Sequence, residues 1–180
     1  RRAADRDAAL RTRGGTVTGA TNDIVGIRAG SVGEWFVQNI PGAKAPFSYE
    51  LLAGGHSNLT YRVLDANGVA YVLRRPPTGA VLASAHDMAR EHKIISGVGQ
   101  TSVPVARALG LCTDVEVNDA PFYVMDFVEG VVLDEAVKVD EHFPSSDQRL
   151  TIGGSVIEVM AALHTVDPDR CGLGDLGRKD

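Results

Sequence analysis

The sequence predicts an α+β fold in which about five strands form a mainly antiparallel sheet, with one helix packed across it. Three observations support this fold class. Short apolar strands follow one another with connections too short for a crossover helix, and Asp65-Ala66-Asn67-Gly68 is a typical hairpin turn. An amphipathic pattern over 84–96 separates the first three strands from the last two. The chain of 180 residues, 44% of them hydrophobic, is long enough for one domain with a core.

The first half of the chain predicts an arm, a helix and three strands. Residues 1–30 are rich in Arg, Gly and Thr without periodicity, and we expect a flexible N-terminal arm there. The amphipathic pattern over 31–40 predicts a helix, which Pro41-Gly42 ends. Strands are then expected over 47–52, around 59–63 and around 71–73, and Pro76-Pro77 closes the last of them.

The second half predicts two helices and two strands. Ser84, with Asp87 three residues later, forms a capping-box pattern and predicts a helix that begins there and runs to Ser96. The expected later elements are strands over 107–112 and 122–128 and a last helix that begins between Ser145 and Gln148, with Ile152, Val156, Val159, Met160 and Leu163 on one face. The chain thus divides into the arm, a lobe with its connector over 31–130, and the beginning of a helical region over 131–180.

Composition and charge exclude several classes of function. The net charge of −5 argues against dedicated nucleic-acid binding, which normally shows a basic surplus. No apolar run is long enough to cross a bilayer, and we expect neither a membrane span nor a signal peptide. Cys112 and Cys171 cannot form a disulfide framework, so a reducing cytoplasm is the expected compartment. The chain begins with Arg1 rather than Met, and we interpret it as a fragment or a processed product.

A glycine turn, Gly54-Gly55-His56-Ser57-Asn58, lies between two expected strands. This position excludes a Walker A loop and a dinucleotide fingerprint, because both lead into a helix N-terminus. A glycine turn between antiparallel strands can instead fold over a nucleotide, since no Cβ blocks the approach of phosphate oxygens to the backbone N–H groups. An ordinary hairpin turn is the alternative.

Glu91 places a carboxylate on the same helical stripe as Met88 and Ile95. An ionised carboxylate on an apolar face needs a cation or several donors. Arg74 and Arg75 are the nearest candidate cations in the sequence, and strand alternation allows only one of them to be the partner. The alternative is that Glu91 reaches solvent at the edge of the helix.

The run 121–130 predicts a buried strand that leaves into a connector at Glu129-Gly130. The end of such a strand can offer backbone C=O and N–H groups to a planar heterocycle, and a plain core strand is the alternative. The sequence contains no cluster of His and Cys with the spacing of a metal site, and no serine-hydrolase elbow.

In this order, the motifs resemble the N-terminal lobe of the aminoglycoside phosphotransferase family within the protein-kinase-like superfamily. The likeness is greatest to the kinase domains found alone or fused ahead of acyl-CoA dehydrogenases. The segments that carry the resemblance are Leu52-Ala53-Gly54-Gly55-His56-Ser57-Asn58-Leu59-Thr60-Tyr61, Tyr71-Val72-Leu73-Arg74-Arg75-Pro76-Pro77, Ser84-Ala85-His86, Arg90-Glu91-His92, Val103-Pro104-Val105, Ala120-Pro121-Phe122-Tyr123-Val124-Met125, Phe127-Val128-Glu129-Gly130 and Leu163-His164.

The resemblance implies ATP with Mg²⁺ as the cofactor and gives each candidate residue a role. The glycine turn would cover the phosphates, Arg74 or Arg75 would stand where the family has a phosphate-binding lysine, and Glu91 would orient that cation. Met125 would line the pocket of the adenine base. The backbone groups of Asp126 and Val128 would bind the edge of the adenine ring. The residues implied to bind the nucleotide are Gly54, Gly55, His56, Ser57, Asn58, Arg74, Arg75, Glu91, Met125, Asp126 and Val128.

The catalytic half of the family's site is not expected in this chain. The family's catalytic Asp follows a His-Gly-Asp-type motif, with a metal-binding Asn five residues later. Asp167, the nearest match, has Gly172 at that distance. The implied function is therefore the N-terminal ATP-binding part of a kinase that acts on a small-molecule hydroxyl, aminoglycoside- or hydroxyacyl-type, and the chain alone is expected to be inactive. A non-catalytic, pseudokinase-like module that binds nucleotide or protein is the alternative, because an arginine stands in the lysine position.

Overall fold

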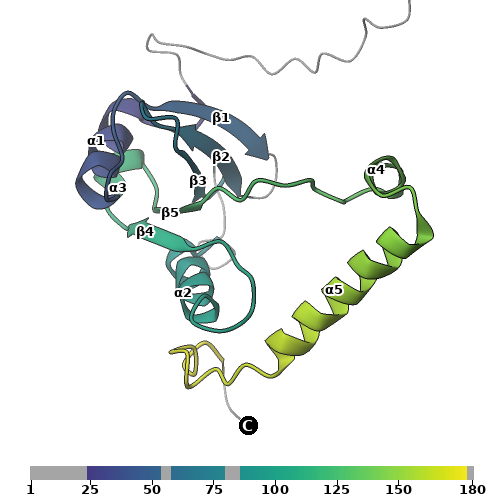
Figure 1. The fold of residues 1–180 in the computed structure, drawn as a ribbon. Helices are drawn as coiled ribbons and strands as arrows, with labels where there is room; N and C mark the ends of the chain where they lie inside the picture. Colours follow the sequence, from purple (N-terminus) through teal and green to yellow (C-terminus); the bar gives the residue numbers. More distant parts are fainter. Residues whose placement is uncertain (1–23, 54–57, 80–85, 178–180) are drawn as a thin grey trace, which may run out of the picture.

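The computed structural model describes residues 24–53, 58–79 and 86–177, which form a sheet flanked by helices (Figure 1). In chain order the elements are α1 (Ala29–Asn39), β1 (Ser48–Ala53), β2 (Leu59–Leu64), β3 (Ala70–Arg75), α2 (Met88–Val98), β4 (Ala108–Cys112), α3 (Val115–Asn118), β5 (Phe122–Asp126), α4 (Ala136–His142) and α5 (Ser146–His164).

The five strands pair in the order β1-β2-β3-β5-β4, and every pair is antiparallel, which confirms the predicted α+β class. The hairpin between β2 and β3 forms at the turn that the sequence predicted. Its Asp65 carboxylate is buried and accepts hydrogen bonds from the backbone N–H groups of Asn67 (2.9 Å) and Val69 (2.8 Å). A side chain that satisfies two turn donors in this way fixes the register of the strands on either side.

The hydrophobic core lies between α1 and one face of the sheet. Alternate residues of the central strands point into it and are fully buried, as are Val32 and Phe36 of α1; the strand residues are Tyr61, Val63, Leu73, Phe122 and Val124. Burying each such side chain contributes about 1.5–3 kcal/mol. Because successive strand residues alternate between faces, the residues between these core positions belong to the opposite face, on the side of α2.

The N-terminal boundary of the packed region lies earlier than the sequence predicted. Residues 24–30 belong to the expected flexible arm, but Ile27 is part of the core and α1 begins at Ala29. Residues 1–23 of the expected arm lie outside the described residues.

Helix α2 begins later than its capping-box pattern suggested. It starts at Met88, and Asp87 is the N-cap, whose carboxylate accepts a hydrogen bond from the Arg90 N–H (2.9 Å). Asp87 thus caps the helix instead of following a cap at Ser84, which lies outside the described residues. Strand β5 is also shorter than expected, since it ends at Asp126 and leaves Val128 in the connector.

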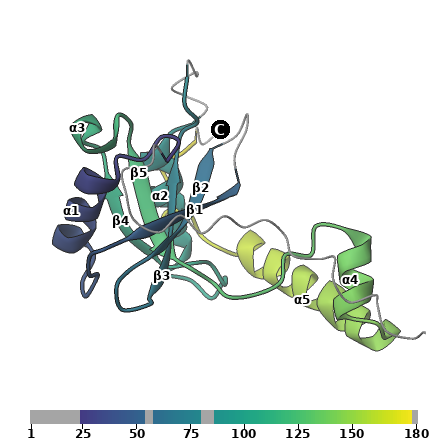
Figure 2. The same ribbon diagram turned by 90° about the horizontal axis from the view of Figure 1, so that it is seen from above.

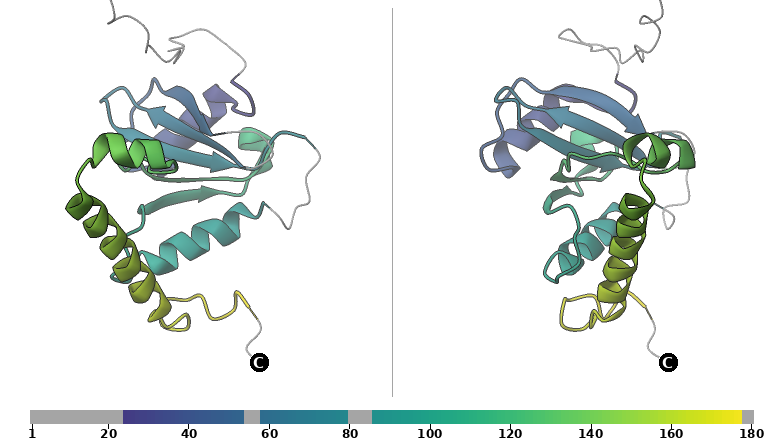
Figure 3. Two further views of the ribbon diagram at one scale, coloured as in Figure 1. Left: turned by 90° about the vertical axis from the view of Figure 1, so that its right-hand side faces the viewer. Right: turned by 45° about the vertical axis from the view of Figure 1, so that its right-hand side comes forward.

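The helices after the sheet stand apart from it, and Figures 1 and 2 place α1 and α5 on opposite sides of the sheet. Helix α5 opens with a capping box between Ser145 and Gln148, at the predicted position. None of its residues is buried, and Val156, Met160 and Leu163 of the apolar face predicted for it are exposed. After α5 the chain returns to α2 (Figure 3), where Lys93 Nζ pairs with the Asp175 carboxylate (2.6 Å). No helix in the described part of the chain is both long and apolar enough to span a membrane.

Candidate functional site

The expected ion pair forms between Arg74 at the end of β3 and Glu91 on α2. Arg74 Nε donates to Glu91 Oε2 at 2.9 Å, and both side chains are about one third exposed. The prediction that Glu91 meets an arginine is therefore confirmed, and the alternative of a solvent-facing carboxylate is wrong. The partner is Arg74, the first of the two candidate arginines.

The Glu91 carboxylate is held by two further donors. The Tyr123 hydroxyl donates to Oε2 at 3.1 Å, and Asn58 Nδ2 donates to Oε1 at 2.7 Å. Burial, and then the neighbouring charge of Glu91, raise the pKa of Tyr123. The phenol therefore stays protonated and remains a donor at neutral pH, so that both oxygens of Glu91 are occupied.

Arg74 keeps part of its guanidinium available. Nη1 donates to the Thr60 hydroxyl at 3.2 Å, across the β2–β3 ladder in which these two residues are paired. Nη2 has no acceptor among the described residues. Val72 pairs with Met125 in the β3–β5 ladder, so Met125 belongs to the same face of the sheet as Arg74. This face presents a fixed guanidinium beside an apolar surface.

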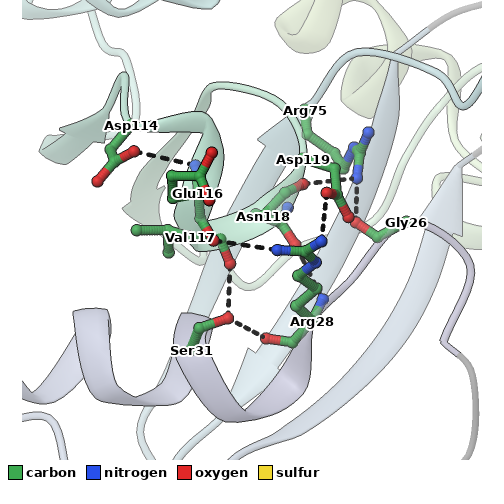
Figure 4. Close-up of polar contacts among 9 residues, drawn as sticks. All are labelled: Gly26, Arg28, Ser31, Arg75, Asp114, Glu116, Val117, Asn118 and Asp119. Carbon is green, nitrogen blue, oxygen red and sulfur yellow. Dashed lines mark hydrogen bonds and ion pairs between the residues drawn. The ribbon is translucent and has the colours of Figure 1, made fainter.

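Arg75 points to the other face and holds the fold together (Figure 4). The side chain is only 4% exposed, and its guanidinium donates to the carbonyls of Pro76 (2.9 Å), Gly26 and Asn118 (3.4 Å). Burial lowers the pKa of Arg75. It links β3 to the segment before α1 and to α3. Of the two arginines that the sequence left open, Arg75 is thus the structural one.

The end of β5 is fixed by a second arginine–carboxylate pair. Arg107 approaches both carboxylate oxygens of Asp126, at 3.1 and 3.3 Å, and its carbonyl accepts the Asp126 N–H at 3.0 Å. The Asp126 N–H is therefore already used within the protein. Val128, two residues further on, is 68% exposed.

The described residues bring together only part of the expected site. Arg74, Glu91 and Asn58 meet directly, whereas Gly54, Gly55, His56 and Ser57 lie outside the described residues. Sequence reasoning missed Tyr123, although its spacing of two from Met125 indicates the same face of β5. It also gave no role to His86, whose Nδ1 lies 2.6 Å from Asn58 Oδ1. Residues 24–53, 58–79 and 86–177 contain no group of three His, Cys, Asp or Glu side chains that could hold a metal ion.

Comparison with known proteins gives consistent matches. The model of the phosphotransferase enzyme family matches residues 48–180. "Acyl-CoA dehydrogenase family member 11" of Mus musculus is 36% identical over 136 residues, which are 72% of this chain and 17% of that protein. "Probable acyl-CoA dehydrogenase IBR3" of Arabidopsis thaliana is 33% identical over 149 residues, 79% of this chain and 18% of that protein.

A crystal structure of a Ralstonia eutropha protein named as an aminoglycoside phosphotransferase has a TM-score of 0.66 at 33% identity. It covers 82% of this chain, and the match covers 41% of that protein's chain. This likeness confirms the kinase-like fold that the motifs implied. The chain spans less than a fifth of the length of the two dehydrogenase-named relatives.

Proposed function

The chain belongs to the phosphotransferase enzyme family, and from this premise we propose that it is the ATP-binding part of a kinase that phosphorylates a small-molecule hydroxyl. The observation that carries the proposal is the Arg74–Glu91 ion pair (2.9 Å) on the face of the sheet opposite the core. A guanidinium held by a carboxylate on a neighbouring helix is a fixed donor for phosphate oxygens.

The described residues offer contacts for both the phosphate end and the base end of a nucleotide. At the phosphate end, Arg74 Nη2 has no protein acceptor within the described residues and can donate to an anionic oxygen. At the base end, the Asp126 carbonyl can accept from an exocyclic amine and the N–H of exposed Val128 can donate to a ring nitrogen, while Met125 supplies apolar contact. When bound, ATP with Mg²⁺ supplies the phosphoryl group; the chain's own residues bind and orient it.

The acceptor is a small-molecule hydroxyl, of aminoglycoside or hydroxyacyl type. The solved relative is named for aminoglycosides and the curated relatives for acyl-CoA substrates, so the two names support different acceptors. The chain acts in the cytoplasm under this proposal. A nucleotide-binding module without catalysis would use the same ion pair. An assay of phosphoryl transfer by the whole protein that contains this chain distinguishes the kinase from such a module.

Nucleotide affinity tests the proposal directly. We expect an ATP analogue with Mg²⁺ to bind the chain in isothermal calorimetry. Glu91→Gln should weaken binding at least about tenfold, because the charge that strengthens the hydrogen bond to Arg74, a contact of about 1.5–3 kcal/mol, is lost. Arg28→Gln is the matched control, since it removes an arginine from another ion pair (Arg28–Asp119, 2.6 Å) beside the core. Equal binding by the three proteins would contradict the proposal.

We further expect no phosphoryl transfer by the chain alone. Kinases need a carboxylate to position the acceptor hydroxyl and residues that hold the metal, and Asp167 lacks the Asn at the required spacing, where Gly172 stands. An ADP-production assay with Mg²⁺ should give no signal above that of heat-denatured chain. Turnover that disappears in Asp167→Asn or Asp175→Asn would show that the catalytic group lies within these residues.

A further inference from the structure

The side chain of Asn58 faces inward. It is 6% exposed, and both ends of its amide are used within the protein. Nδ2 lies 2.7 Å from Glu91 Oε1, and Oδ1 lies 2.6 Å from His86 Nδ1. An ionised carboxylate only accepts hydrogen bonds, so the amide nitrogen must face Glu91 and the amide oxygen must face the histidine.

This orientation determines the form of His86. Because Asn58 presents an acceptor to it, Nδ1 must carry a proton, and both the neutral Nδ1–H tautomer and the imidazolium meet this requirement. His86 lies just before the N-cap of α2, and Asn58 lies just before the first residue of β2. The hydrogen bonds therefore join the entry of α2 to the entry of β2 through a side chain that also holds Glu91.

We infer that Asn58 and His86 are positioning residues that fix the Glu91 carboxylate for Arg74. The chain of contacts runs from His86 through Asn58 to one oxygen of Glu91, and the other oxygen pairs with Arg74. Tyr123 donates to that second oxygen, whereas Asn58 is the donor to Oε1 among the described residues. Loss of Asn58 therefore removes the contact that sets the orientation of the carboxylate. The inference rests on the proposed function, because the pair so positioned is the one proposed to bind phosphate.

In this role, the side chain at position 86 must carry an N–H group at the position of the His86 Nδ1 atom. His86→Asn supplies such a donor, since the amide nitrogen of Asn occupies nearly the position of Nδ1, whereas His86→Ala does not. Asn58→Asp keeps the size of the side chain and replaces the donor toward Glu91 by an oxygen. Two carboxylates would then face each other, which drives Glu91 away from its place.

The first test observes the ion pair without any ligand, through the Nε–H resonance of Arg74 in ¹H–¹⁵N spectra, assigned with Arg74→Lys. In the native chain the proton should be resolved and slow to exchange. We expect this signal to be lost in Asn58→Asp and His86→Ala and restored in His86→Asn. His142→Ala is the control, because that histidine makes a similar hydrogen bond (to the Lys138 carbonyl, 2.9 Å) on exposed α4 and should leave the signal unchanged.

The second test is the affinity of each variant for the ATP analogue with Mg²⁺. His86→Ala should weaken binding about threefold to tenfold, as expected for the loss of one hydrogen bond, and His86→Asn should recover most of it. An unchanged Arg74 signal in His86→Ala overturns the inference, as does the absence of a resolved signal in the native chain. If Asn58→Asp does not fold, the two histidine variants decide. If the Arg74 signal responds but no protein binds nucleotide, the positioning role stands and the proposed function fails.

Discussion

Arg74 and Arg75 are neighbours in the sequence but belong to different structures. The alternation of a strand predicted that only one could meet Glu91, but which one depends on which face of β3 carries the core. That information comes from the pairing of Leu73 with Tyr61, both fully buried, which turns Arg75 to the core side. The choice therefore needed the tertiary structure.

The two arginines should differ in their effect on stability. Arg75→Met removes donors to three carbonyls at a buried site and should lower the free energy of unfolding by about 3 kcal/mol. Arg74→Met breaks a partly exposed pair and should cost about 1 kcal/mol or less. Urea unfolding followed by circular dichroism measures both values. Equal losses would mean that Arg75 does not anchor the three segments.

At the level of elements, strong periodic patterns and hairpin turns were predictable, and short elements were not. Helix α3 (Val115–Asn118) is a single turn, which is too short to show a helical period, and its cap Asp114 acts locally by accepting the Glu116 N–H. Helix α4 has only seven residues, about two turns, which is too short to show a clear helical period. The contact between Asn58 and His86 joins residues 28 apart in sequence, and no spacing rule indicates it.

The packing of α2 against the chain that follows α5 depends on a glycine. A Cβ added at Gly97 would lie 2.7 Å from the Cys171 carbonyl oxygen and 2.7 Å from Leu173 Cδ2. Gly97→Ala should therefore push the 171–173 segment off α2, although Ala favours the helix by about 1 kcal/mol. Gly153→Ala on α5 is the matched control, since an added Cβ there meets nothing within 4 Å.

Thiol labelling can measure this displacement, because Cys171 and Cys112 are both free and buried and react with a labelling reagent only when they become exposed. We expect labelling of Cys171 to speed up in Gly97→Ala and to stay slow in Gly153→Ala, with the labelled site identified by mass spectrometry. Cys112 serves as the internal reference and should remain slow in both variants. Slow labelling of Cys171 in Gly97→Ala would mean that the segment adjusts without leaving the helix.

At the scale of the whole molecule, the tyrosines share one electrostatic feature. The chain has four tyrosines, and burial is the first cause that raises the pKa of each: Tyr49, Tyr61, Tyr71 and Tyr123. In the unfolded chain a phenol ionises near pH 10. A pKa raised in the folded state contributes stability that is fully present below about pH 10 and is lost as the pH rises from there toward the folded value.

Alkaline titration should show this coupling. The absorbance of tyrosinate at 295 nm should stay low through pH 10 while the protein is folded, and it should rise together with unfolding at higher pH. The free energy of unfolding in urea should fall above pH 10, after a smaller decrease that begins at about pH 8.5, because burial also raises the pKa of the Cys112 thiol. A tyrosine that ionises near pH 10 while the circular dichroism spectrum is intact would contradict the burial of these side chains.

The ion pair of Glu91 does not by itself encode the alignment of β3. If β3 slipped by one residue, Arg75 would take the place of Arg74, and Glu91 would still meet a guanidinium. Other contacts distinguish the two alignments. The slip turns Tyr71 and Leu73 out of the core, removes Arg75 from its three carbonyls and disturbs the turn that Asp65 holds. An intact ion pair is therefore no proof of a correctly paired sheet in this protein.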